Sequence, residues 1–195
     1  LKLGVELWIT SEWYASLDME QSFFKAKNGL AGSTPDSLSF THSQYDLVFG
    51  YKYAVTGNFW GPQITVGGGF LMGNTQVTDS NPTAFTSNST NGWQLHLGGN
   101  FPVSNDNKTA FGAKAKFVLF ETFKETPVDS GKSDATINSF GVYLTHQIST
   151  HLQLKPEINY GMNSVSYSGS ASNANPLRSS EEKAVSYLFG VEYLF

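Results

Sequence analysis

The sequence contains no cysteine, so neither a disulfide nor a thiolate-bound metal is available to this chain. It has no apolar run near the roughly 18–20 residues that a membrane-spanning helix requires. Charged residues make up only 14% of the chain, against about 25% in an ordinary soluble domain. The net charge of -4 argues against a nucleic-acid partner, because proteins that bind nucleic acid carry basic patches. These absences argue against disulfide-stabilised, helical membrane and nucleic-acid-binding proteins.

Aromatic residues and glycine are abundant instead. Aromatic residues make up 14% of the 195 residues, and there are 19 glycines. The mean hydropathy of -0.24 would, taken alone, suggest a soluble protein. A transmembrane β-barrel combines these properties, because apolar and polar residues alternate along its strands and aromatic residues gather at both membrane interfaces. The composition therefore favours such a barrel.

Apolar and polar residues alternate in eight segments, which predicts eight strands that each have one apolar face. In the second segment, for example, Tyr45, Leu47 and Phe49 share one face, and Gln44 and Asp46 share the other. No segment has a helical period strong enough to compete, although residues 18–30 could hold a short helix or extend the first hairpin. The eight predicted strands lie at about 1–13, 38–55, 63–78, 93–103, 111–123, 140–148, 152–162 and 185–195.

The predicted connections alternate between short and long. Long stretches rich in Ser, Thr, Asn, Gly and Pro alternate with short ones, a layout typical of outer-membrane barrels with short periplasmic turns and long extracellular loops. We therefore expect residues 1–195 to form one up-and-down antiparallel transmembrane barrel in a bacterial outer membrane, with both termini periplasmic. Because the chain opens directly on a strand-like pattern, we interpret it as a mature protein whose export signal has been removed, although a truncated chain would look the same. The short connections are 56–62, 104–108 and 149–151, and the long ones are 18–37, 79–91, 124–135 and 168–182.

Alternation alone does not distinguish a membrane barrel from a soluble, lipocalin-like barrel, because both have an apolar and a polar face. The interior of an eight-stranded barrel is just wide enough for side chains to fill. The apolar face carries about five large residues per strand, which is too much volume for that interior. We therefore expect the apolar face to point outward, into lipid, and the polar face to point inward.

The inward face is then predicted to hold equal numbers of acidic and basic residues. A neutralised network of salt bridges that fills the lumen is the favoured interpretation, because buried charges persist when they are paired. The alternative is a polar path for ions or small solutes, which a layer of apolar inward residues would interrupt. The expected charge network is Glu6, Asp46, Lys52, Lys114, Lys116, Lys155, Glu157 and Glu192, and the expected apolar plug is Trp8, Val48, Leu71, Val118, Phe120 and Leu188.

The last eleven residues alternate and end on an aromatic residue: Val185, Tyr187, Phe189, Val191, Tyr193 and Phe195 share one face. This pattern resembles the β-signal that the outer-membrane assembly machinery reads, with Phe189, Val191, Tyr193 and Phe195 as its aromatic and apolar positions. With eight strands and alternating loops, the whole chain resembles the small barrels of the OmpA/OmpX type. That resemblance implies fold, location and an assembly partner rather than an activity, since one fold hosts many functions.

Some barrels of this size modify lipids, so we considered catalytic groups. His146, Ser149 and His151 are close in sequence but fall at a predicted periplasmic turn, and no oriented base accompanies a nucleophile there. His42 and His96 are predicted to point inward without a third metal ligand fixed by the spacing. We therefore predict no enzyme activity, no metal and no cofactor, and keep a lipid-modifying enzyme as the third hypothesis.

One patch of small residues interrupts the bulky apolar face. It comprises Gly68, Gly99, Ala113 and Ala115 on neighbouring predicted strands. Because small residues allow membrane surfaces to approach closely, the patch suggests a homo-oligomeric contact or a groove for an acyl chain. Ordinary variation in wall packing is the alternative. The favoured function is a non-enzymatic barrel with a plugged lumen that contacts phospholipid or lipopolysaccharide and acts through its surface or by self-association; a narrow porin-like channel is the runner-up.

Overall fold

A computed structural model describes residues 1–27, 37–57, 61–77, 86–126, 128–172 and 178–193. These residues form nine β-strands in a single antiparallel sheet, in which every strand pairs with the next one along the chain. They contain no helix able to cross a membrane. The strands are β1 (Lys2–Trp8), β2 (Trp13–Lys27), β3 (Ser37–Ala54), β4 (Gln63–Val77), β5 (Ser87–Pro102), β6 (Thr109–Thr126), β7 (Lys132–Ser149), β8 (Leu152–Ser168) and β9 (Ser179–Tyr193).

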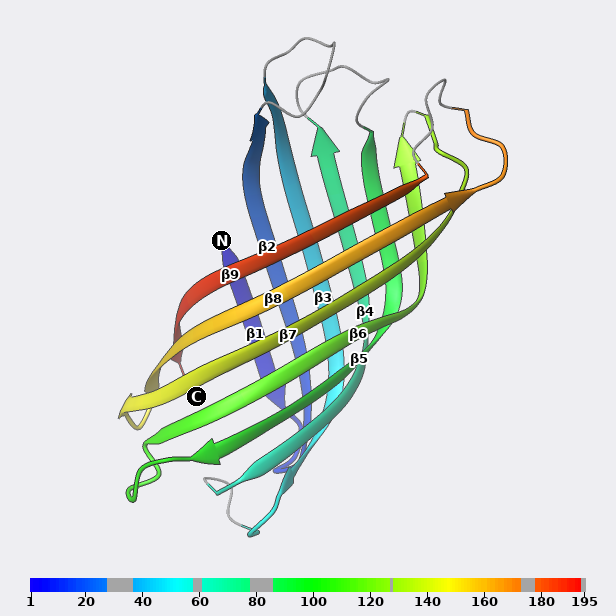
Figure 1. The fold of residues 1–195 in the computed structure, drawn as a ribbon. Coiled ribbons are helices and arrows are strands. Elements are labelled where there is room, and N and C mark those ends of the chain that lie inside the picture. Colours follow the sequence, from blue (N-terminus) through cyan, green and yellow to red (C-terminus); the bar gives the residue numbers. More distant parts are fainter. Residues whose placement is uncertain (28–36, 58–60, 78–85, 127, 173–177, 194–195) are drawn as a thin grey trace.

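The sheet is strongly curled, so that β6 to β9 cross in front of β1 to β5 (Figure 1). We call the end at which β1, β3, β5, β7 and β9 finish the lower end, and the opposite end the upper end. An all-β, up-and-down antiparallel architecture is therefore confirmed. The hydrogen-bonded order starts at β1 and stops at β9, and in the described residues no pairing joins these two strands. The described sheet is thus a curled half-barrel with two edges, whereas the sequence predicted a closed barrel.

The number of strands differs from the prediction because the first predicted strand, 1–13, contains β1 and a turn, after which β2 follows as an additional strand. The amides of Ile9 and Thr10 donate to the carbonyl of Trp13 (2.9 and 3.3 Å), and the Thr10 hydroxyl accepts from the amides of Glu12 and Trp13 (3.2 and 3.0 Å). Hydroxyl side chains stabilise turns through such local bonds. The apolar alternation continues across this turn and conceals it, so the described residues form nine strands instead of the eight predicted.

The direction of β1 is reversed by the same turn. Strand β1 runs down to residues 9–12, and β2 returns upward as far as Lys27. Part of the predicted loop 18–37 is therefore strand, and of the two possibilities for residues 18–30 the described residues 18–27 extend the hairpin rather than form a short helix. The Leu1 ammonium bonds the carbonyl of Gln21 (2.7 Å), and Gln21 pairs with Ser43 in the upper half of β3. The first residue therefore lies beside the upper half of the sheet, whereas β9 finishes at the lower end (Figure 1).

Several strands extend beyond their apolar stretches. Strand β5 begins at Ser87 rather than 93, β7 at Lys132 rather than 140, and β9 at Ser179 rather than 185. Their added residues are mostly Ser, Thr, Asn, Asp, Glu and Lys. The ladder continues there because backbone pairing does not depend on an apolar face, so the predicted loops 79–91, 124–135 and 168–182 were too long.

The apolar face of the sheet is the exposed one. On β3, Leu47 and Phe49 are 54% and 51% exposed, whereas the intervening Val48 is 3% exposed and Asp46 is 9% exposed. The same alternation of exposed apolar and covered residues recurs on β7, where Phe140 and Val142 flank the buried Gly141. Apolar side chains therefore cover the outside of the curl, and polar side chains fill its inside.

Candidate functional site

The inside of the curl holds ion pairs between strands that lie far apart in the sequence. Lys116 on β6 lies 3.3 Å from Asp46 on β3, although β4 and β5 separate these strands in the sheet. The curl therefore brings opposite walls within reach of each other. All eight residues of the predicted charge network are ion-paired. Three pairs join strands that are not neighbours in the sheet, namely Lys52 with Glu6 (3.8 Å), Lys114 with Glu157 (2.5 Å) and Lys116 with Asp46, whereas Lys155 with Glu192 (2.8 Å) joins the adjacent strands β8 and β9.

The carboxylate of Asp46 has the most complete set of donors. Its Oδ2 accepts from the Gln44 side-chain amide (2.7 Å) and from the Lys116 ammonium (3.3 Å), and Oδ1 lies 3.4 Å from the same ammonium. The Asp46 and Lys116 side chains are only 13% and 16% exposed. A buried charge is tolerated when its remaining hydrogen-bonding capacity is satisfied, and here both carboxylate oxygens are bonded.

Two tyrosine rings fill the interior next to glycines. Tyr14 on β2 is paired in register with Gly50 on β3, and its ring occupies the space where a side chain at Gly50 would be. Tyr143 on β7 covers Gly112 on β6 in the same way. We did not identify Tyr14 from the sequence, because the large-next-to-small pairing is visible only when the strand register is known.

The lysines also contact aromatic faces. The Lys52 ammonium lies 3.9 Å from the centre of the Trp8 ring, and the Lys155 ammonium lies 4.9 Å from that of Tyr143. Such contacts stabilise a cation that has left bulk water. Trp8 thus covers a charged group and remains 37% exposed near the edge of the sheet, and its place in the apolar plug stays a prediction.

A smaller apolar layer than predicted lies within the curl. Leu71 is 1% exposed, Val48 3% and Val118 6%. Val118 lies against Gly92, which is the register partner of Leu71, so these residues line one region of the interior. Leu188 is only half-buried on the edge strand β9, and its place in the plug stays a prediction. The side chain of Phe120 lies outside the described side chains.

Other buried polar atoms in the interior have no hydrogen-bond partner among the described residues. Gln94 is 3% exposed, and neither atom of its side-chain amide is bonded. Each such group costs about 1–3 kcal/mol if it stays dry, so the interior is polar enough to hold bound water. The others are His96 Nε2, Asn100 Oδ1, both carboxylate oxygens of Glu121, and Asn163 Oδ1.

Glu121 faces inward because of a local irregularity that the sequence does not reveal. The β5–β6 register shifts between Asn91 and Trp93, which pair with Thr122 and Leu119. Beyond this point Glu121, Phe123 and Glu125 are covered while the intervening residues are exposed. A bulge adds a residue to one strand and exchanges its two faces, which moved Glu121 to the interior.

The histidines considered as catalytic or metal-binding groups form separate contacts. His42 Nδ1 lies 2.9 Å from Thr75 Oγ1, and His146 Nδ1 lies 2.9 Å from Thr109 Oγ1. His151 Nδ1 lies 2.9 Å from Thr150 Oγ1, and its amide donates to Ser149 Oγ (3.3 Å). In the described part of the chain, no three His, Cys, Asp or Glu residues gather as metal ligands.

An apolar groove of about 640 Å³ crosses the outer face of β5 to β8. Three of the four predicted small residues line it, namely Gly99, Ala113 and Ala115, while Gly68 on β4 does not. Gly99 pairs with Ala113 in register, so two small residues lie side by side at its centre. Larger side chains border this space, among them Phe101, Phe140 and Tyr160.

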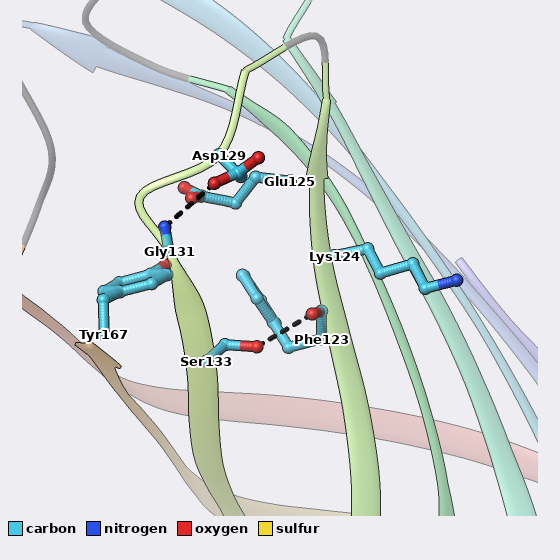
Figure 2. Close-up of a pocket in the computed structure, with 7 residues that line it drawn as sticks. All are labelled: Phe123, Lys124, Glu125, Asp129, Gly131, Ser133 and Tyr167. Atoms are coloured by element: carbon cyan, nitrogen blue, oxygen red, sulfur yellow. Dashed lines mark hydrogen bonds between the residues drawn. The ribbon is translucent and has the colours of Figure 1, made fainter. Parts of the chain in front are cut away.

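A second pocket, of about 290 Å³, lies at the upper end between β6, β7 and β8 (Figure 2). Phe123 and Tyr167 meet edge to face in it, with ring centres 6.2 Å apart. The Gly131 amide donates to Asp129 Oδ1 (3.0 Å), and the Ser133 hydroxyl donates to the carbonyl of Phe123 (2.8 Å). Apart from its turn residues, nothing in the sequence indicates this pocket.

Asp129 links the connection between β6 and β7 to the segment that follows β8, through hydrogen bonds to Ser172. Its Oδ2 accepts from the Ser172 hydroxyl (2.9 Å), and its own amide donates to Ser172 Oγ (2.8 Å). The hydrogen bond from Ser172, together with those from the Gly131 and Ser172 amides, lowers the pKa of Asp129 below its ordinary value. This carboxylate therefore stays ionised and holds two upper connections together.

The residues of the predicted assembly signal lie on the outer face of β9. Phe189 is 69% exposed, and Val191 and Tyr193 are each 61% exposed. Phe195 lies outside the described residues.

Comparison of the chain with protein-family models and with curated proteins gives no match.

Proposed function

We propose that this chain is a non-enzymatic integral protein of a bacterial outer membrane, a small barrel of the class that the sequence resembles. The proposal rests on one observation: apolar side chains lie on the outside of the sheet and charged side chains on the inside, the reverse of the arrangement in a water-soluble protein. Large apolar side chains such as Leu47, Phe49 and Val142 are about half exposed, while the carboxylates of Asp46 and Glu157 are buried. An exposed apolar surface this extensive is unfavourable in water and favourable in lipid.

Insertion into lipid vesicles tests the membrane location. The refolded chain should resist extraction by urea and alkali, and protease added to the vesicles should cut only at strand ends. Substitution of an outward residue by Lys, as in Leu47→Lys, should reduce insertion, because a lysine at the bilayer midplane costs about 2–4 kcal/mol. The matched control is Gln44→Lys, on the polar face of the same strand. Full extraction of the unaltered chain by urea would contradict the proposal.

The same proposal holds that the interior is plugged. Leu71, Val48 and Val118 form an apolar layer in the interior, and the ion pairs described above fill much of the remaining space. A hydrophobic constriction excludes water and ions. We therefore propose a structural or surface-interaction role that uses the outer face and the upper connections, with lipid and the assembly machinery as its partners.

A narrow channel is the second candidate, and the unbonded interior groups favour it. Gln94, Glu121 and Asn163 offer polar atoms that water or an ion could contact. Conductance across a planar bilayer separates the two functions. The unaltered chain should give no steady openings, whereas Leu71→Ala combined with Val118→Ala should give them; Leu47→Ala on the outer face is the control. Steady openings of the unaltered chain would favour the channel.

A further inference from the structure

Glu121 is the exception among the charged residues of the interior. The charge network consists of ion pairs, whereas none of the ion pairs in the described part of the chain includes Glu121. Both oxygens of its carboxylate are buried without a hydrogen-bond partner, and Asp134, which lies within electrostatic range, has a charge of the same sign. A buried charge without a countercharge is strongly unfavourable. A positive charge beside this carboxylate would remove that cost.

A second unsatisfied group lies next to Glu121. Gln94 is 3% exposed, and neither the oxygen nor the nitrogen of its side-chain amide is bonded within the described residues. Its register partner is Val118, whose Cγ1 would lie 2.6 Å from a side-chain carbon at Gly92. The Cβ of Glu121 would lie 3.0 Å from that same carbon. Gly92 and Gln94 are successive inward residues of β5, about 7 Å apart, so Gln94 and Glu121 flank one position in the interior.

This position lies on the upper side of the apolar layer. Strand β6 runs upward, so Glu121 lies above Val118, which belongs to that layer (Figure 1). On the outer face of β6, the exposed Leu119 is followed by Thr122 and Lys124, which are polar. Glu121 therefore lies at the upper border of the apolar outer face, and a ligand from the upper end does not have to cross the apolar layer to reach it.

We propose that Gln94 and Glu121 bind one divalent metal cation, calcium in preference to magnesium. The ligands are the carboxylate oxygens of Glu121 and the amide oxygen of Gln94, and water completes the coordination, since both metals prefer oxygen ligands. The charges of Glu121 and Asp134 together favour a divalent over a monovalent ion. Calcium fits better than magnesium, because it accepts irregular sets of about six to eight oxygens, whereas magnesium requires near-ideal octahedral geometry.

This site differs from the metal sites that the sequence led us to consider. Those sites used histidine, and in the described part of the chain no three His, Cys, Asp or Glu residues gather as ligands. Here one carboxylate and one amide supply the oxygens. The sequence does not place them together, because the bulge between Asn91 and Trp93 is what turns Glu121 inward.

Urea unfolding of the refolded full chain in detergent, at increasing concentrations of calcium chloride, tests the proposal. A ligand that binds only the folded chain raises its stability with concentration, so the urea midpoint should rise with each addition. Choline chloride at the same ionic strength is the control, because any salt also screens the surface charges. Magnesium chloride should raise the midpoint less than calcium chloride. Equal midpoints in calcium chloride and choline chloride would overturn the proposal.

Three variants test the assignment of the ligands. Glu121→Gln keeps the size of the side chain and removes its charge, so it should abolish the calcium-dependent shift, and Gln94→Leu should reduce it. Glu181→Gln, in the exposed pair with Lys183, should leave the shift unchanged. Calorimetric titration of each folded variant with calcium chloride gives the same comparison without unfolding. A calcium response that persists in Glu121→Gln, or that Gln94→Leu leaves unchanged, would overturn the proposal.

The inference rests on the fold of the interior rather than on the proposed membrane location, and the two can fail separately. Extraction of the chain from vesicles by urea, together with calcium binding in detergent, would overturn the location and retain the cation site. Resistance to extraction without a calcium response would do the opposite.

Discussion

The ion pairs of the sheet differ in how deeply their side chains are buried. Lys116 and Asp46 are held between opposite walls, whereas Lys183 and Glu181 form a pair on β9 whose side chains are 51% and 56% exposed. Exposed pairs contribute about 0–1 kcal/mol because water screens them. Removal of one partner of a buried pair leaves the other charge uncompensated. Burial therefore decides which of these two pairs matters for stability.

Lys116→Ala should lower the free energy of unfolding by about 3–5 kcal/mol, because Asp46 then stays buried without a countercharge. Urea unfolding in detergent measures the effect, and Lys183→Ala is the control, for which we expect at most about 1 kcal/mol. The double change Asp46→Leu with Lys116→Met should recover most of the loss. Equal effects of Lys116→Ala and Lys183→Ala would contradict the importance of the interior pair.

Gly50→Ala should lower the free energy of unfolding by about 1–3 kcal/mol, since the added methyl group would overlap the Tyr14 ring. Gly161→Ala is the matched control, because nothing lies within 4 Å of a Cβ at that strand position. Combining Gly50→Ala with Tyr14→Ala should cost less than the sum of the two single changes, as expected for residues in contact. Additive costs would mean that the ring does not occupy this space.

At the scale of strands and their connections, the period-2 alternation was enough to identify most strands and the face each one exposes. The hairpin at residues 9–12 was missed because Leu7, Ile9 and Trp13 continue the alternation through the turn. The inward position of Glu121 was missed because a bulge leaves no mark in a period-2 pattern. The polar ends of β5, β7 and β9 were missed because the prediction relied on apolar residues.

The connection held by Asp129 should loosen in acid. Its pKa is lowered in the folded chain, so its stabilising contribution is complete above the pKa of the unfolded chain and is lost as the pH falls through the folded value. The protection factor of the Gly131 amide, which compares its exchange rate with that of an unstructured amide at the same pH, should therefore fall at low pH. Ser172→Ala should lower this protection factor already at neutral pH. A protection factor at Gly131 that does not change with pH would contradict this role of Asp129.

The outer groove gives a prediction about association. If chains meet through the small residues, Ala113→Trp should fill the groove and reduce the fraction of oligomer measured by sedimentation in detergent. Leu47→Trp, at another exposed position of the outer face, is the control. An unchanged size distribution for Ala113→Trp would rule out self-association through this groove and leave it to lipid.

At the scale of the whole molecule, the sequence predicted an antiparallel all-β chain and the residues of the interior ion pairs. Their partners depend on the curl of the sheet, since Lys116 and Asp46 are 70 residues apart and meet across two intervening strands. The lack of pairing between β1 and β9 in the described residues was not predicted, because strand alternation says nothing about whether the first and last strands meet. The face of a strand on which a side chain lies follows from the sequence, whereas contacts between strands that are not neighbours depend on the curvature of the sheet.

The placement of the interior lysines also has a consequence for how the chain finds its fold. Successive side chains of a strand point to opposite faces, so a slip of one residue in pairing would turn every inward residue of that strand outward. In the proposed membrane location, such a slip in β6 would expose Lys114 and Lys116 to lipid, at about 2–4 kcal/mol each near the middle of a bilayer. The charges that fill the interior would then also select the correct strand register, because every misaligned sheet would carry this cost.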